Sequence, residues 1–354
     1  MVTSRAGRVI AVTAVASVVT LGSVAIGGVP LLFGLLVMVV AGMMLLPFGP
    51  RRYLLRRTVR VLTTIFVAMA IVWLLVHNYP DASRDSPTGV IPAMERYIVW
   101  ISDLLFGEFG DSTYSETVGE GLSRTIPIST QLVVYSQVVA VLIAVPGAIA
   151  GARFRGRSID LGFRALTLLG LALPIFVIGP IFQYALGVGD IDMLGMSWGW
   201  QVFPVGRYIP FGDGPVEHFQ SMALPSITLG VTTAAVYMVL LRSEIIQQLP
   251  SEHVLLARSK GVPPGRIIRV HALRPASPSV VAAIGAQSSL LFGHMLIIER
   301  IFILPGFGDY VLVAIGRRDD LAVVGALFVT AAILALVNLF ADALLLAIDP
   351  RLET

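Results

Sequence analysis

Few side chains in this sequence could do chemistry, and their spacing excludes most kinds of active site. The chain has no cysteine, which excludes disulfides, cysteine-ligated zinc and a thiol nucleophile. Lys260 is the only lysine, and it stands between Ser259 and Gly261 rather than in the Gly-Lys-Ser/Thr order of a P-loop. The chain therefore carries no Walker-type ATP site and needs no cofactor of its own. Any energy from ATP must come from a partner. Nor is a metal site expected, because the histidines form no HxxxH or HExxH pair: His77, His218, His253, His271 and His294.

The clearest ionisable group inside an apolar stretch is Asp342, which lies one helical turn after Asn338. A charge within a membrane is costly and often marks function. An ion pathway usually needs several such groups on facing helices, and the other apolar stretches are nearly free of them. Two interpretations stay open. Asn338 and Asp342 are a functional intramembrane pair, or Asp342 pairs structurally with a backbone or arginine group near the membrane surface.

The elements that would position these groups are membrane helices. The chain is 56% hydrophobic and only 13% charged, whereas soluble domains are about 25% charged. A helix needs roughly 20 apolar residues to cross a bilayer. We expect an all-α, polytopic transmembrane protein. Eight stretches are long enough or nearly so: 9–27, 31–48, 59–78, 129–150, 163–187, 222–243, 279–298 and 322–347.

The first two stretches are interpreted as a transmembrane hairpin within residues 1–50. Arg5 and Arg8 before an apolar run would also suit a signal peptide. A second apolar run follows after only Gly27-Gly28-Val29-Pro30, however, and that spacing favours a hairpin over a cleaved leader.

Arginine placement predicts the orientation. The segments before 60, around 151–164, from 242 to 278 and after 348 hold 18 of the 25 basic residues, and the opposite side holds 16 of the 22 acidic ones. The basic side should be cytoplasmic, with both termini on that side. The external segments are then 79–128, 188–221 and 299–321. Within the first, Ile98, Ile101 and Leu105 have helical spacing and predict a helix over 94–106. Prolines interrupt several spans and indicate either kinks along a pathway or simple packing irregularity: Pro146, Pro174, Pro180 and Pro225.

The most informative region is the cytoplasmic loop at 246–278. Ser251 is expected to cap a short helix whose positive N-terminus suits Glu252, and Gly261 is expected to end it in the left-handed conformation. Pro263-Pro264 then forces a turn, and Pro264 can begin a second short helix. This predicts a compact helix–turn–helix with Val254, Leu255 and Ala257 as an apolar contact surface beside Arg258 and Lys260. Attraction to anionic lipid would explain the charge alone, whereas a protein partner also explains the glycine and the prolines.

The motifs of this loop resemble a known family. Ala257-Arg258-Ser259-Lys260-Gly261, followed by His271-Ala272-Leu273-Arg274, looks like the EAA loop of binding-protein-dependent ABC permeases, in the dipeptide/oligopeptide/nickel group. Further matches cover about 51–354: Arg51-Arg52-Tyr53-Leu54-Leu55-Arg56-Arg57, Gly107-Glu108-Phe109-Gly110, Glu299-Arg300-Ile301-Phe302, Pro305-Gly306-Phe307-Gly308, Arg318-Asp319, Asn338-Leu339 with Asp342, and Asp349-Pro350-Arg351.

The resemblance implies a six-helix type I ABC importer permease core over 51–354, with residues 1–50 as an added hairpin. It implies a multi-pass protein of the prokaryotic cell membrane that transports peptides. Its partners would be a second homologous permease chain, two ABC ATPase subunits that hold ATP and Mg, an extracytoplasmic solute-binding protein and membrane lipids, with no nucleic acid. The coupling residues would be Glu252, Ala257, Arg258, Lys260, Gly261, His271, Leu273 and Arg274, and the external gate residues Pro305, Gly306, Phe307 and Gly308.

The sequence departs from the family pattern at two places. Leu255-Leu256-Ala257 stands where the general pattern has Glu-Ala-Ala, and Tyr79-Pro80-Asp81-Ala82 stands where the group usually has Pro-Gly-Asp-Pro. The second departure leaves the substrate class open, and nickel or another small solute is an alternative to peptides. The alternatives from other classes are an ion-coupled secondary transporter and a non-transporting membrane scaffold.

Overall fold

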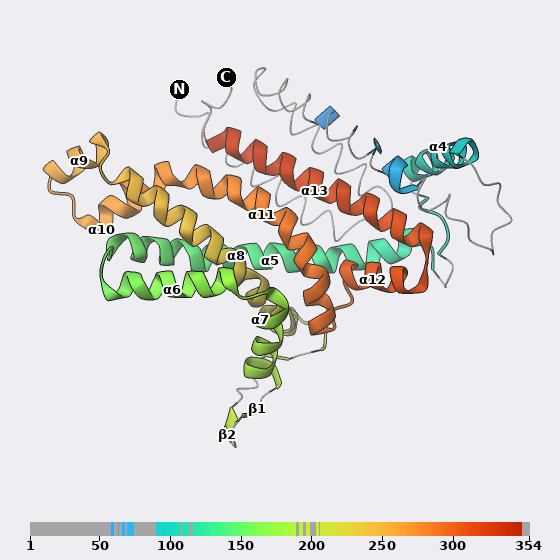
Figure 1. The fold of residues 1–354 in the computed structure, drawn as a ribbon, viewed down its shortest axis with the longest axis horizontal. Helices are drawn as coiled ribbons and strands as arrows, with labels where there is room; N and C mark the ends of the chain where they lie inside the picture. Colours follow the sequence, from blue (N-terminus) through green and yellow to red (C-terminus); the bar gives the residue numbers. More distant parts are fainter. Residues whose placement is uncertain are drawn as a thin grey trace. The chain divides into compact units, whose positions relative to one another are not determined.

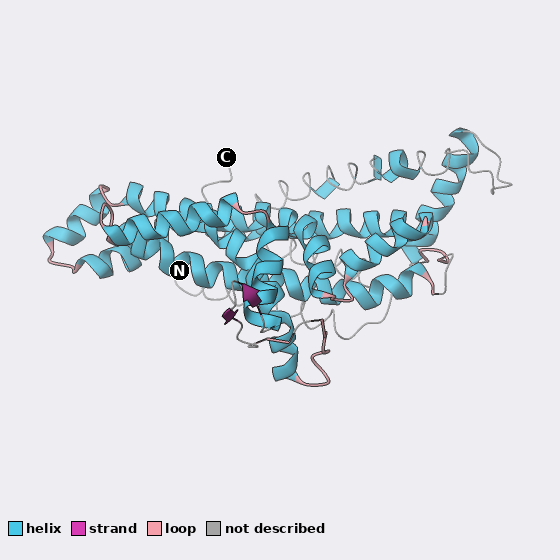
Figure 2. Ribbon diagram, turned by 60° about the horizontal axis from the view of Figure 1, so that its bottom comes forward, coloured by secondary structure: helices cyan, strands magenta, loops and turns pink. Residues whose placement is uncertain are grey.

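The computed structural model describes residues 90–348, apart from 107, 113–115, 189–190, 194–195, 199–202 and 205, and short pieces between 58 and 73. Almost every described element is helical, and the exception is one small hairpin of strands (Figure 2). The chain divides into two compact units, one formed by 1–127 with 310–354 and the other by 128–309. The boundary falls within two helices, and each unit is described by itself.

The elements follow one another along the chain with short connections. Their bounds are α4 Val90–Phe106, α5 Val118–Arg153, α6 Ser158–Ala172, α7 Ile175–Phe182, the π-helix η1 Gln183–Val188, β1 Ile191–Met193, β2 Met196–Trp198, α8 Pro215–Gln248, α9 Glu252–Ser259, α10 Pro264–Arg266, the π-helix η2 Ile267–Ala272, α11 Leu273–Phe302, α12 Phe307–Arg317 and α13 Asp320–Ile348. The antiparallel pair β1–β2 sets Ile191 opposite Trp198.

Four of the described helices are long and apolar enough to cross a membrane, and a fifth crossing is added if one bent pair of helices counts as a single span. The four are Val118–Arg153, Pro215–Gln248, Pro264–Phe302 and Asp320–Leu339. The expectation of an all-helical protein with several spans is therefore confirmed. The predicted spans at 9–27 and 31–48 lie outside the described residues, as does most of the one at 59–78.

The stretch at 163–187 is interrupted at Pro174, one of the prolines that were expected to mark either kinks or packing irregularity. It breaks between Ala172 and Ile175, where its two halves meet at 108°. Pro174 disfavours a helical conformation in the residue before it, and Leu173 accordingly lies in the extended region at φ −82° and ψ 123°. Figure 1 shows α7 leaving the direction of α6 at this point. The aromatic segment that follows contains β1 and β2.

In the unit formed by 128–309, small side chains let α5 and α8 approach closely. Ala140, Ala144 and Ala148 recur every fourth residue on α5 and are buried in one hydrophobic cluster with Tyr237 and Leu241 of α8. This is the small-residue spacing by which membrane helices pack backbone to backbone. Gly230 shows how tight the contact is, because a Cβ built there would lie 2.7 Å from the Cγ1 of Val139 and 3.0 Å from the carbonyl oxygen of Ser136.

A hydrogen-bonded chain crosses the same core. The hydroxyl of Tyr237 donates to the Oε1 of Gln137 at 2.7 Å, and the Nε2 of Gln137 donates to the Oγ of Ser288 at 2.8 Å. One polar residue from each of α5, α8 and α11 thus takes part in this chain, and each has a hydrogen-bond partner on a neighbouring helix. In a membrane such bonds stabilise helix association because the alternative is a polar group left in hydrocarbon.

In the other unit, α4 confirms the predicted helix over 94–106. Ile98 is 61% exposed, whereas Tyr97 and Trp100 are buried with Met69 and Trp73. The hydroxyl of Tyr97 donates to the carbonyl oxygen of Phe66 at 2.8 Å, which satisfies the polar end of a buried ring. Ile101 also packs against this cluster, so the buried face of α4 combines the aromatic side chains with part of the aliphatic stripe.

Tyr310, the first residue of this unit in α12, packs against a glycine of α5. A Cβ built on Gly121 would lie 2.6 Å from the tyrosine ring. Burial raises the pKa of Tyr310 to about 12, with the nearby charges of Asp319 and Glu116 adding to the effect. The phenol therefore stays neutral at any physiological pH.

Candidate functional site

The loop at 246–278 contains the helix that the sequence predicts. α9 begins after Ser251, which has the extended backbone of an N-cap residue at φ −67° and ψ 151°. Its hydroxyl does not cap the helix as expected. It donates instead to the carbonyl oxygen of Gln248 at 2.5 Å, which fastens the turn back to the end of α8. Glu252 is exposed in the first turn, where a negative charge suits the helix dipole.

The end of α9 is a Schellman motif. The amide of Val262 donates to the carbonyl of Ala257 at 3.2 Å, and the amide of Gly261 donates to that of Arg258 at 2.9 Å. Gly261 has φ +76°, the left-handed conformation that was predicted for it. Nothing lies within 4 Å of a Cβ built at Gly261, so glycine is favoured there by backbone conformation alone.

The second helix of the loop begins at Pro264 as predicted, but it is not a separate short helix. α10, η2 and α11 run on without a break as one helix of 39 residues, Pro264–Phe302. The amides of Arg266 and Ile267 both donate to the carbonyl of Pro263, which starts this helix. The turn after α9 therefore connects directly to a candidate membrane span. In Figure 1, α9 and α10 lie beyond the ends of α8 and α11.

Burial corrects the expected contact surface of α9. Val254 and Ala257 are buried with Ile267 and Val262 in a small cluster inside the turn. Leu255 and Leu256 are 50% and 57% exposed, and Arg258 and Lys260 are exposed beside them. Val254 and Ala257 therefore fix α9 to the following helix. The apolar groups left on the surface are the two leucines.

The remaining coupling candidates lie further along the second helix. The ring nitrogen Nε2 of His253 lies 3.2 Å from the carbonyl oxygen of His271, which joins α9 to the start of the span. Leu273 is half-buried against the core cluster, and Arg274 is exposed. The structure thus brings these residues onto one compact turn and the helix leaving it.

Sequence reasoning missed an ion-pair cluster on the same side of this unit. Asp160 in α6 is 1% exposed and receives both Arg242 at 2.8 Å and Arg164 at 2.9 Å. The amide of Gly156 also donates to its Oδ2 at 3.0 Å. Arg242 lies two turns before the end of α8, so the cluster ties the 154–157 turn to the helix that leads into α9. The sequence signal that could have revealed this cluster is Asp160 itself, a single acidic residue within the arginine-rich segment around 151–164.

The external loop is organised by a buried carboxylate. Glu299, near the end of α11, is fully buried, and its Oε2 accepts the amides of Gly308 at 2.7 Å and Asp309 at 3.2 Å. Its Oε1 accepts the hydroxyl of Ser129 from α5. The Oγ of Ser129 in turn accepts the amide of Phe307 at 2.7 Å. One carboxylate and one hydroxyl therefore satisfy three successive amides at the start of α12.

The glycines of this loop are required by the same carboxylate. A Cβ on Gly306 would overlap the carboxyl group of Glu299, and a Cβ on Gly308 would lie 2.7 Å from the Cα of Leu296. Gly306, Phe307 and Gly308 are buried, whereas Pro305 is exposed. The candidate gate residues therefore form a closed, tightly packed turn.

Comparison with known proteins decides the family. Residues 143–354, which include both loops, match the model of the binding-protein-dependent transport system inner membrane component. The chain belongs to this family of permeases. It is 26% identical to the dipeptide transport system permease protein DppB of Lactococcus lactis over 318 residues, 85% of this chain and 99% of the relative. It is 25% identical to DppB of Bacillus subtilis over 321 residues, 85% and 98%. A Brucella suis protein named as a peptide transport system permease is 28% identical over 255 residues, 72% and 78%.

Family membership confirms several expectations at once. The chain is an inner-membrane, multi-pass permease of an ABC transporter, and permeases of this family have no ATPase activity of their own. No cofactor is expected in the chain. A binding-protein-dependent transporter works with ATPase subunits and with a binding protein. Within the described residues, no three His, Asp or Glu side chains form a group that could hold a metal ion.

Of the predicted intramembrane residues Asn338 and Asp342, the structure describes the side chain of Asn338 alone. Asn338 is half-buried on α13, and Asp342 lies one turn further along the same helix. The side chain of Asp342 falls outside the described residues, as do Gly107 and the tail at 349–351. The functional and the structural interpretations of Asp342 both stay predictions.

Proposed function

We propose that this permease forms half of the translocation pathway of an ATP-driven peptide importer and pairs with a second, homologous permease chain. Its core would be six spans within 51–354, with residues 1–50 as an added hairpin and both termini in the cytoplasm. Five candidate spans, counting the bent pair, and the helical residues 69–73 inside the expected span at 59–78 support the six-span core. The dipeptide permeases leave 15% of this chain unmatched, about the size of the first 50 residues.

The observation that carries the coupling role is the exposed leucine pair on α9. Leu255 and Leu256 project from a short helix that buried contacts hold rigidly against a span. Burying one exposed leucine side chain contributes about 1.5–3 kcal/mol of free energy. A partner that covers both leucines would therefore gain binding free energy from them. An ATPase subunit is the partner that a permease of this family requires. Arg258 and Lys260 would add charge contacts at the rim of this surface.

In the proposed mechanism, ATP binding closes the two ATPase subunits and moves α9. The motion passes to α8 through the turn at Ser251 and to Pro264–Phe302 through the Schellman motif and the cluster around Val254. Access then switches between the two sides of the membrane by rigid motion of packed helices. The loop at 305–308 would act as the external gate.

Peptides are the favoured substrate because the matched relatives are named as dipeptide or peptide permeases. Nickel or another small solute is the alternative within the same family. A secondary transporter or a scaffold would require a chain of this family to act without its ATPases.

The coupling proposal is tested by replacing both leucines. Leu255→Ser with Leu256→Ser, in the complex purified through this chain, is expected to reduce recovery of the ATPase subunits and ATP-driven uptake. The matched control is Leu161→Ser, which changes a leucine on α6 that is 69% exposed, more than either test residue. Full recovery of the ATPases and full uptake in the double variant would contradict the docking role.

The substrate is tested in proteoliposomes loaded with ATP and supplied with the cognate binding protein. Radiolabelled dipeptides and pentapeptides should accumulate, and nickel should not compete. Uptake that persists without ATP and follows an ion gradient would instead favour a secondary transporter.

A further inference from the structure

One hollow in the structure lies outside the docking surface and the external loop. It has a volume of about 650 Å³ and is lined by Arg153, Arg266 and Arg269 together with Pro263, Pro264, Gly265 and Val270. We propose that it binds the phosphate group of an anionic phospholipid headgroup. This proposal is independent of what the transporter carries.

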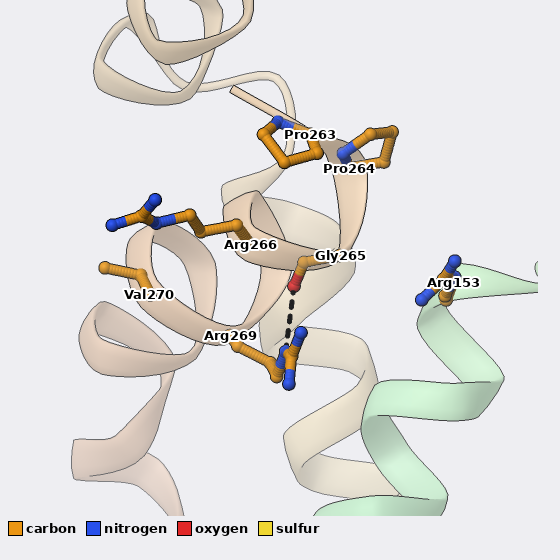
Figure 3. A pocket seen from close by; sticks show the side chains of 7 residues that line it. All are labelled: Arg153, Pro263, Pro264, Gly265, Arg266, Arg269 and Val270. Atoms are coloured by element: carbon orange, nitrogen blue, oxygen red, sulfur yellow. Dashed lines mark hydrogen bonds between the residues drawn. The ribbon is translucent and has the colours of Figure 1, made fainter. Parts of the chain in front are cut away.

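Two guanidinium groups converge on one side of the hollow. A point one Cβ away from Gly265 lies 3.1 Å from the Nη1 of Arg153 and 4.0 Å from the Nη2 of Arg269. Figure 3 shows Arg153 at the end of α5 and Arg269 on the facing helix, while Arg266 and Val270 extend in the opposite direction. Arg153 and Arg269 are therefore the two groups that a single anion could bridge, and Arg266 stands at the rim.

These arginines have spare donors and, among the described residues, no anionic partner. None of the ion pairs among the described residues includes Arg153, Arg266 or Arg269, and the nearby carboxylate of Asp160 is taken by Arg242 and Arg164. The Nε of Arg269 donates to the carbonyl of Gly265 at 3.3 Å, which orients its guanidinium and leaves both Nη groups available. The guanidinium of Arg153 lies 5.5 Å from the ring of Phe154, which limits its movement.

The chemistry of this pair fits phosphate. The planar fork of a guanidinium matches two oxygens of a phosphate group. Two unpaired cations held close together repel each other, and an anion bound between them offsets this repulsion. A phosphodiester with no attached cation, as in phosphatidylglycerol, offers the required negative charge.

The position of the hollow selects a lipid over a soluble anion. Arg153 is the last residue of one candidate span and Pro264 is the first of another, so the hollow lies where two spans end. Arg153 lies only three residues after the predicted span at 129–150, so we expect the hollow to lie near the headgroups where that span ends. Basic pockets between spans on the cytoplasmic side bind acidic headgroups in this manner.

The test uses the whole complex, purified through this chain and stripped of lipid by detergent exchange. Native mass spectrometry measures binding of phosphatidylglycerol and of phosphatidylcholine with the same acyl chains, with inorganic phosphate as a competitor. Arg153→Gln and Arg269→Gln are expected to weaken phosphatidylglycerol binding about tenfold each, since each removes a charge-assisted hydrogen bond. Arg155→Gln removes the same charge from an exposed residue of the same turn that does not line the hollow, and it should leave binding unchanged.

The outcomes separate the sources of the anion. Displacement of phosphatidylglycerol by inorganic phosphate supports the phosphate chemistry, and binding of inorganic phosphate alone assigns the hollow to a soluble anion. Equal loss in Arg155→Gln, or no loss in either test variant, overturns the proposal. Loss of the ATPase subunits from the Arg153 and Arg269 variants with unchanged lipid binding also overturns it, because these arginines would then contact protein. Equal melting temperatures of all three variants ensure that unfolding is not the cause.

Discussion

Replacing Glu299 with alanine removes the acceptor on which the external loop is built. In the native loop this carboxylate accepts the hydroxyl of Ser129 and the amides of Gly308 and Asp309. No side chain near it in the described residues makes an ion pair with it, so its contribution comes from these hydrogen bonds. The alanine variant leaves the Ser129 hydroxyl and the Gly308 amide buried without an acceptor.

The magnitude follows from those two donors. A buried donor that loses its acceptor costs about 1–3 kcal/mol, so the closed loop should lose roughly 3 kcal/mol relative to an open one. Since 1.4 kcal/mol corresponds to a factor of ten, the open population should rise about 100-fold.

The absence of native cysteine makes this opening easy to measure. A single Leu304→Cys thiol, at a position that is 2% exposed, is labelled by maleimide in detergent only when the loop opens. We expect labelling about 100-fold faster in the Glu299→Ala background. Ile303→Cys, at the exposed neighbouring position, should label at the same rate in both backgrounds.

A matched control comes from the next residue. Arg300 pairs with Asp309 at 2.9 Å on the surface, and such pairs contribute about 0–1 kcal/mol. Arg300→Ala should therefore leave labelling of Leu304→Cys nearly unchanged. Unchanged labelling in Glu299→Ala, or an equal increase in Arg300→Ala, would refute the reasoning that the buried carboxylate holds the loop.

Three further predictions follow from single contacts. Gly261→Val should cost about 1–2 kcal/mol of backbone strain in the left-handed conformation and should reduce substrate-stimulated ATP hydrolysis and uptake. Asparagine tolerates this conformation, so Gly261→Asn should keep both activities. Unchanged activity of the valine variant would contradict the coupling role. Asp160→Asn should lower the melting temperature in detergent, because it costs roughly 2–4 kcal/mol to leave Arg242 without its anion; an unchanged melting temperature would show that this cluster adds little. Gly230→Ala should destabilise by about 1–3 kcal/mol through overpacking, whereas Gly293→Ala, with nothing within 4 Å of its Cβ, should be neutral or slightly stabilising in the same melting assay. Equal effects of the two alanines would refute the close helix contact.

The sequence was sufficient wherever a signal was local. Gly261 and Pro264 mark the end of one helix and the start of the next by their own backbone preferences, and the structure places both as predicted. The long spans were also predictable, because a run of apolar residues leaves few alternatives to a membrane helix. Both kinds of signal are carried by consecutive residues.

The features that the sequence did not reveal depend on distant residues. Val254 and Ala257 face inward because Ile267, on the far side of the turn, covers them, and helical spacing alone could not choose between that face and the one with Leu255. Ser129 lies 170 positions before Glu299, so their hydrogen bond had no local pattern. Pro174 signalled a kink, but the 108° turn depends on how α7 packs on α8 and α11.

The unbroken helix from Pro264 to Phe302 has a mechanical consequence. Its 39 residues make a rod about 58 Å long at 1.5 Å per residue. A tilt of about 5° around one end displaces the other by about 5 Å, close to one helical turn. One end of this rod leaves the turn that contains Gly261, and the other end holds Glu299. A small rotation of the helix at the turn is thereby converted into a displacement of several ångströms at the loop. The length of the helix sets how large that displacement is for a given tilt.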